Sequence, residues 1–80
     1  MTITAEQCRA GRSLLGMKQE ELCSTADVTH KTLSDFESGK TTPYASTLNK
    51  LRSALESSGV VFVDPNGLGP GVRLKDAGKA

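Results

Sequence analysis

The segment from residue 29 to residue 38 separates polar from apolar side chains at helical spacing. The polar side holds His30, Lys31, Ser34, Asp35 and Ser38, and the apolar side holds Leu33 and Phe36. A lysine such as Lys31 can donate to O6 and N7 of guanine, and His30 can do likewise or contact a phosphate. Asp35 is repelled by phosphates but can accept from N4 of cytosine, so it can select against other bases. The pattern indicates a surface suited to a DNA groove.

Two short helices joined by a sharp turn would present this surface. Leu22 and Ala26 lie on one apolar stripe at helical spacing. Asp27 follows, and aspartate is one of the few residues that tolerate the left-handed backbone of such a turn. Thr29 is a good N-cap, and Gly39 has the conformational freedom to end a helix. The sequence therefore predicts a helix-turn-helix, with helices over 19–26 and 29–38.

Two further helices and a small core are expected around this unit. A capping box over Thr4 to Gln7 predicts a helix over 4–15. Gly11 interrupts this helix, which indicates either close approach of another helix or simple tolerance. Leucines at helical spacing predict a last helix over 45–58, ended by Gly59. The predicted core consists of Cys8, Leu15, Leu22, Cys23, Ala26, Val28, Leu33, Phe36, Leu48, Leu51 and Leu55.

Several motifs occur together in a fixed order along the chain. They are Arg12, Leu15-Gly16, Gln19-Glu20-Glu21-Leu22, the run from Leu33 to Lys40, Thr42-Pro43 and the run from Thr47 to Leu55. In this order they resemble the Xre/Cro family of DNA-binding proteins, also called lambda-repressor-like, over roughly residues 3–59. The resemblance implies a mainly α, four-helix domain and a sequence-specific transcriptional regulator, a repressor that occludes a promoter. The second helix of its helix-turn-helix is expected to read the major groove.

The resemblance also implies roles for individual residues. Gln19 matches a family position that bonds a backbone phosphate, and Lys18 replaces the usual hydroxyl or Asn cap with a cation near phosphate. Lys40 and Thr41, in the loop after the helix, resemble positions that grip phosphate. The predicted DNA-binding residues are Lys18, Gln19, Thr29, His30, Lys31, Ser34, Asp35, Lys40 and Thr41.

Two positions are expected to act structurally. In the family, residues that match Arg12 and Glu37 form an ion pair between the first helix and the end of the third. Breaking such a partly buried pair costs about 3 kcal/mol or more. Tyr44, in the loop before the last helix, has two open interpretations: a lid on the core or a phosphate donor.

Net charge gives little support for nucleic-acid binding. Residues 1–59 contain seven Lys/Arg and seven Asp/Glu, and the formal charge of the chain is +1. The positions of the positive charges matter more than their number, because Lys18, Lys31 and Lys40 lie at the ends and on the outer face of the expected DNA-facing helices. We therefore expect moderate, salt-dependent binding per protomer and a need for two protomers.

Composition excludes several other classes of protein. With 80 residues the chain is a single small domain, too short for the catalytic cleft of most enzymes. It contains no apolar run near the ~20 residues of a membrane span and no leader pattern, so we expect a cytoplasmic protein. Cys8 and Cys23 fall on inward stripes and are interpreted as core residues. His30 has no partner pattern for a metal or a catalytic triad, so no cofactor, metal or enzymatic activity is expected.

The composition changes after Gly59. Residues 60–64 are β-branched and aromatic, turn formers follow, and 71–75 alternate, which predicts a short strand pair. An isolated hairpin is marginally stable, so this segment must pack on the helices or pair with another chain; an unstructured tail is the alternative. Pairing would give a homodimer suited to a palindromic operator. The expected division is thus a DNA-binding domain over 1–59 and a possible dimerisation element over 60–80, with 76–80 frayed.

A second function remains open on the sequence alone. The same helical fold can serve as a protein-interaction module, such as the antitoxin component of a toxin-antitoxin pair. The C-terminal strands would then dock on the partner by strand addition.

Overall fold

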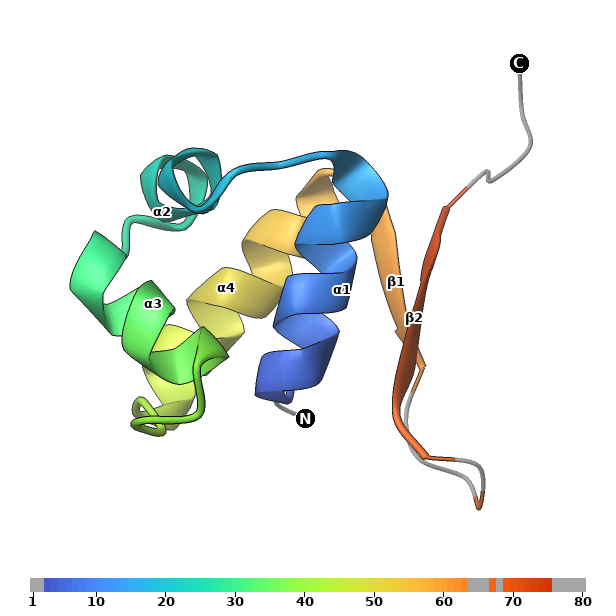
Figure 1. Ribbon diagram of the computed structural model, residues 1–80. Helices are drawn as coiled ribbons and strands as arrows, with labels where there is room; N and C mark the ends of the chain where they lie inside the picture. The colour runs from blue at the N-terminus through green and yellow to red at the C-terminus, as the bar shows by residue number, and fades with distance from the viewer. Residues whose placement is uncertain (1–2, 64–66, 68, 76–80) are drawn as a thin grey trace.

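The computed structural model describes residues 3–63, 67 and 69–75 and shows four helices followed by a β-hairpin (Figure 1). The elements are α1 (Ala5–Leu15), α2 (Gln19–Ala26), α3 (His30–Glu37), α4 (Ala45–Ser57), β1 (Val60–Val63) and β2 (Gly71–Leu74). The helices pack into one body, and the hairpin lies along α1 and α4 at the end opposite to α2 and α3. The expected four-helix, mainly α fold with a C-terminal strand pair is confirmed.

The helix ends follow the expected capping chemistry. Thr4 and Gln7 form a reciprocal capping box at the start of α1. Asp27 ends α2 with a left-handed backbone at φ 58°, and the Thr29 hydroxyl accepts the amide of Thr32 at the start of α3. Gly39, at φ 82°, donates to the carbonyl of Phe36, which closes α3 without strain. The turn between α2 and α3 is therefore fixed by local residues.

The core contains most of the predicted residues and four others. Leu22, Leu33, Leu51, Leu55 and Cys8 are fully buried. Three predicted members are only partly buried and pack against the core: Leu15, Cys23 and Val28. Four buried residues were missed: Ile3, Ala54, Val60 and Phe62. The last two come from β1, so the hairpin and the helices share one core.

Gly11 lies where α1 approaches both α4 and β1. A Cβ at this position would be 3.6 Å from Leu55 Cδ1 and 3.6 Å from Val60 Cγ1. These are ordinary contact distances, so the backbone of α1 has come close enough for a methyl group to fill the remaining space. The helix α1 therefore packs on α4 and β1 at this position, but this packing does not require a glycine, because the methyl group of alanine would fit there.

The hairpin is antiparallel and is fastened to the first helix. Val60 pairs with Leu74 and Val63 with Gly71. The Gln7 side-chain amide donates to the carbonyl of Gly71 at 3.0 Å and to that of Val63 at 3.5 Å. Over the described residues, the alternative of an unstructured tail is therefore wrong. The strand end expected at residue 64 and the fraying expected at 76–80 lie outside the described residues.

Candidate nucleic-acid interface

The outer face of α3 lies at the edge of the molecule farthest from the hairpin (Figure 1). Leu33, Phe36 and Glu37 turn into the protein and are buried, whereas His30 and Lys31 are exposed. Three buried residues on one side leave the opposite side of the helix to solvent. This arrangement presents the polar surface that the sequence predicts.

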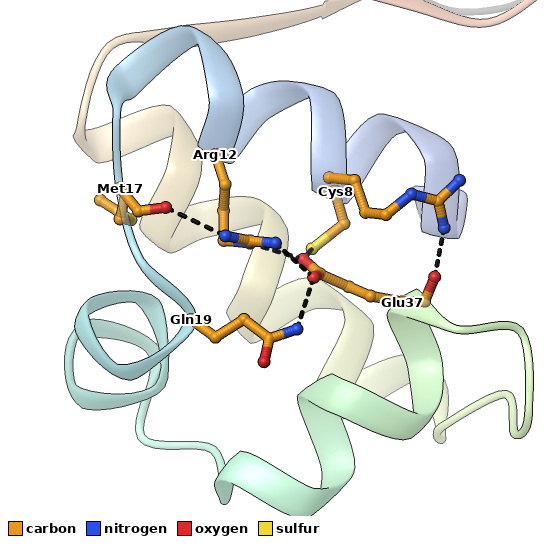
Figure 2. A network of polar contacts seen from close by, with 6 residues as sticks. Cys8, Arg12, Met17, Gln19 and Glu37 are labelled. Carbon is orange, nitrogen blue, oxygen red and sulfur yellow. Dashed lines mark hydrogen bonds and ion pairs between the residues drawn. The ribbon is translucent and has the colours of Figure 1, made fainter.

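A buried carboxylate holds α3 against α1 and α2. The Glu37 side chain is 3% exposed and accepts hydrogen bonds from three residues (Figure 2). Arg12 donates from Nε to Oε2 at 2.8 Å and from Nη2 to Oε1 at 2.6 Å. This is the bidentate geometry that a guanidinium and a carboxylate favour. Gln19 Nε2 donates to Oε1 at 2.8 Å, and the Cys8 thiol donates to Oε2 at 3.2 Å. The Arg12–Glu37 ion pair is thus the centre of a network that includes all three helices.

Arginines of α1 also bind main-chain carbonyls in the link between α1 and α2 and at the end of α3. Arg12 Nη1 donates to the carbonyl of Met17 at 3.0 Å, in the link between α1 and α2. Arg9 donates from Nη1 to the main-chain carbonyl of Glu37, at the last turn of α3. Cations are favoured at this end of a helix, where carbonyl groups lack helical partners. Arg9 was not among the predicted residues, because its role depends on how α1 crosses α3.

The network sets the ionisation of its members. Burial disfavours the charged carboxylate, but hydrogen bonds from Arg12, Gln19 and Cys8 and the charge of Arg12 outweigh it, so the pKa of Glu37 lies below its ordinary value. Burial, together with the neighbouring Glu37, raises the pKa of the Cys8 thiol. Cys8 is therefore a neutral hydrogen-bond donor to an ionised acceptor, and its thiol is unreactive at neutral pH.

The lowered pKa of Glu37 predicts a loss of stability in acid. A group whose pKa is lower in the folded state stabilises the fold fully above its unfolded pKa, and this contribution disappears as the pH falls through the folded pKa. We expect the free energy of unfolding, measured with urea, to decrease as the pH falls below about 5. NMR titration of the Glu37 side-chain carboxyl carbon should give a midpoint below 4.5, the ordinary value. A midpoint at or above 4.5 would contradict the assignment.

Lys18 and Gln19 open α2 in different ways. The exposed Lys18 side chain has no acceptor for a helical amide, so Lys18 caps α2 through its main chain alone: its N–H donates to Glu21 Oε1 at 2.8 Å, and its carbonyl accepts from the amide of Leu22 at 3.1 Å. Gln19 is half-buried, and one hydrogen of its amide nitrogen is committed to Glu37. No described residue accepts the other hydrogen, and the contact of Gln19 with a phosphate stays a prediction. This link to Glu37, which no sequence pattern predicts, fixes the side-chain direction of a residue expected to contact DNA.

Thr29 and Ser34 are less available for contacts with DNA than the sequence predicts. The Thr29 hydroxyl accepts the amide of Thr32 at 3.2 Å and donates its proton to Thr32 Oγ1 at 2.8 Å. Its hydroxyl proton is therefore already used within α3, although the side chain is exposed. Ser34 is half-buried. His30 and Lys31 are thus the most accessible of the predicted residues on this helix.

The loop after α3 forms an open groove with the helix. The groove has a volume of about 520 Å³, and its lining includes Lys31, Asp35, Thr41 and Tyr44. The amides of Lys40 and Thr41 both donate to the main-chain carbonyl of Asp35, at 2.8 and 3.3 Å, which ties the loop to the helix. Lys40 and Thr41 are exposed. The structure therefore brings two predicted phosphate-binding residues beside the predicted base-reading residues.

Tyr44 is not a lid on the core, because it is 86% exposed. Its ring stands at the groove, at the N-cap of α4. Of the two interpretations drawn from the sequence, the lid is wrong.

The chain matches the model of the helix-turn-helix family over residues 9–62, which is more than half of its length. The match runs from α1 through the helix-turn-helix and α4 into β1. The chain therefore belongs to the helix-turn-helix family, of the Xre or lambda-repressor-like type, and is a DNA-binding transcription regulator. No curated protein sequence matches it.

Two further features are absent from the described part of the chain. None of its helices combines the length and apolar character needed to cross a membrane. Its His, Cys, Asp and Glu side chains do not gather into any group able to hold a metal ion.

Proposed function

We propose that this protein is a sequence-specific repressor of transcription in the cytoplasm, without enzymatic activity, that reads the major groove with α3. The observation that carries the proposal is the exposed polar face of α3 combined with the rigid support behind it. Glu37 fixes the inner side of the helix through Arg12, Gln19 and Cys8, so the outer side is held in one orientation. A preoriented helix loses less conformational freedom on binding DNA than a mobile one.

Residues around α3 suit the phosphate backbone. Lys18 and Gln19 lie at the start of α2, where main-chain amides and the helix dipole favour an anion. Lys40 and Thr41 lie at the other end of α3, in the loop that Asp35 holds. Phosphate contacts on both sides would fix the register of the helix, and side chains on α3 would supply the sequence preference.

We infer that the functional form is a homodimer on a palindromic operator. In an antiparallel pair, hydrogen-bonded and non-bonded residue pairs alternate, and the amide of Lys75 donates to the carbonyl of Gly59. Because Lys75 belongs to a hydrogen-bonded pair, Leu74 and Val72 belong to non-bonded pairs. Their main-chain N–H and C=O groups therefore point away from β1, toward the outer edge of the two-stranded sheet. The edge can pair with the same edge of a second copy.

The test is a binding-site selection on random duplexes, with the molar mass of the complex measured in the same buffer. We expect an inverted repeat with half-site centres about 10 base pairs apart, or a multiple of that, and two chains per duplex. Lys18→Ala should weaken binding to all sequences and lower the salt dependence by about one phosphate contact per protomer. Lys75→Ala, an equal charge change beside the hairpin, should change neither property.

Other outcomes would redirect the assignment. If the folded protein binds no duplex even at low salt, the regulator proposal is wrong. If it binds DNA as a single chain at a non-repeated site, the homodimer is wrong. If the edge of β2 instead forms a stable complex with a different protein, the interaction module becomes the better assignment.

A further inference from the structure

We propose that Lys31 and Asp35 act together as one unit that reads a single G·C base pair, with Lys31 on the guanine and Asp35 on the cytosine. This inference rests on the proposed function of α3. It goes further in stating which base pair is read and in making the two residues dependent on each other.

The two side chains are already joined in the free protein. Lys31 Nζ donates to Asp35 Oδ2 at 3.0 Å across one turn of α3. The Lys31 side chain is 84% exposed, and the Asp35 side chain is 18% exposed because it lies beneath the lysine and against the loop. Asp35 Oδ1 accepts no hydrogen bond from any described residue. The unit therefore presents a donor and an acceptor side by side at the centre of the exposed face.

A G·C pair offers the complementary arrangement in the major groove. Guanine O6 is an acceptor, cytosine N4 is a donor, and the hydrogen bond that joins them spans about 2.9 Å. This separation matches the 3.0 Å between Lys31 Nζ and Asp35 Oδ2. The ammonium can donate to O6 while the second hydrogen on N4 donates to the carboxylate. Each charge then keeps its partner after water is removed, which avoids the cost of an unpaired buried charge.

The other base pairs fit this unit less well. A T·A pair also places an acceptor beside a donor, but the thymine methyl occupies the space that the lysine needs next to O4. The adenine N7 lone pair would face the carboxylate. Guanine instead provides N7 as a second acceptor for the ammonium. Reversing the pair to C·G exchanges donor and acceptor relative to the direction of α3, so both contacts become repulsive.

The test compares sequence preferences among variants of the whole chain. The operator is first defined by selection with the unaltered protein, and selection is then repeated with Lys31→Ala, Asp35→Ala and the double variant. We expect both single variants to lose the preference for G·C at the same position of each half-site, by about tenfold or more. The double variant should lose no more than either single variant. Lys75→Ala, which removes an exposed positive charge beside the hairpin, is the control and should leave that position unchanged.

The outcomes separate this inference from the proposed function. The Lys31 side chain is 84% exposed, and a pair one turn apart on a helix with one exposed partner adds little to stability, so the variants should fold, as circular dichroism can verify. If the two single variants relax different positions, or if neither alters a preference that the unaltered protein has, the paired unit is wrong while the regulator stands. If the unaltered protein selects no sequence, the proposed function itself fails.

Discussion

Replacing Glu37 by glutamine should lower the free energy of unfolding by about 3 kcal/mol or more. The carboxylate is 3% exposed and accepts two hydrogen bonds from Arg12. Glutamine would leave the Arg12 guanidinium without a counter-charge and would turn an amide NH₂ toward other donors. Urea denaturation near neutral pH, followed by circular dichroism, measures the change. Small domains are stable by only 5–15 kcal/mol in general, so the loss is a large fraction of the total.

Glu56→Gln provides the matched control for this substitution. Glu56 pairs with Arg52 at 3.0 Å on one face of α4, and its side chain is 44% exposed. Exposed pairs of this kind contribute under about 1 kcal/mol. Equal losses in the two variants would mean that the Glu37 network does not anchor α3. A large loss for Glu37→Gln alone should be accompanied by weaker operator binding, because α3 would no longer be held in place.

Replacing Phe62 by alanine should cost about 3 kcal/mol of folding free energy. Phe62 lies on β1, is 8% exposed and belongs to the same core as the helices. Its ring also lies under the Arg52 guanidinium, 5.3 Å from the ring centroid. Alanine would leave a cavity and remove this contact. Thermal or urea denaturation of the variant, at a concentration where the mass is known, gives the value.

Val61→Ala in the same strand is the control for Phe62→Ala. Val61 is half-buried and pairs with the exposed Arg73 on the other face of the sheet. We expect its loss to be clearly smaller than that of Phe62→Ala. If Phe62→Ala left stability unchanged, the hairpin would be an appendage independent of the helical domain. The division at residue 59 would then describe two separate units.

The helix ends and the turn between α2 and α3 were predictable because they depend on residues that are neighbours in the sequence. The Thr4 and Thr29 caps, the left-handed Asp27 and the terminating Gly39 each act through neighbours within a few residues. The hairpin's place was not predictable in the same way. Val60 and Phe62 become core residues only because β1 packs beside α1 and α4, and no spacing along the chain encodes that docking. Leu15 and Val28 are less buried than predicted, since they lie at the borders of the core.

The candidate site shows the same limit. Exposure of His30 and Lys31 follows from helical periodicity, which the sequence displays. The bond from Gln19 to Glu37 depends instead on how α2 crosses the end of α3, so Gln19 was predicted only as a phosphate contact. The resemblance to a known family implied the pairing of Arg12 with Glu37. The presence of Cys8 and Arg9 around the same residue required coordinates.

Gln7 joins the beginning of the fold to its end. One side chain caps the first turn of α1 through Oε1 and holds β1 and β2 through Nε2. A shortened chain that begins after this residue would lose its opening helical turn together with the hydrogen bonds that tie the closing hairpin to α1. Trimming of this protein for biophysical work should therefore spare the first seven positions.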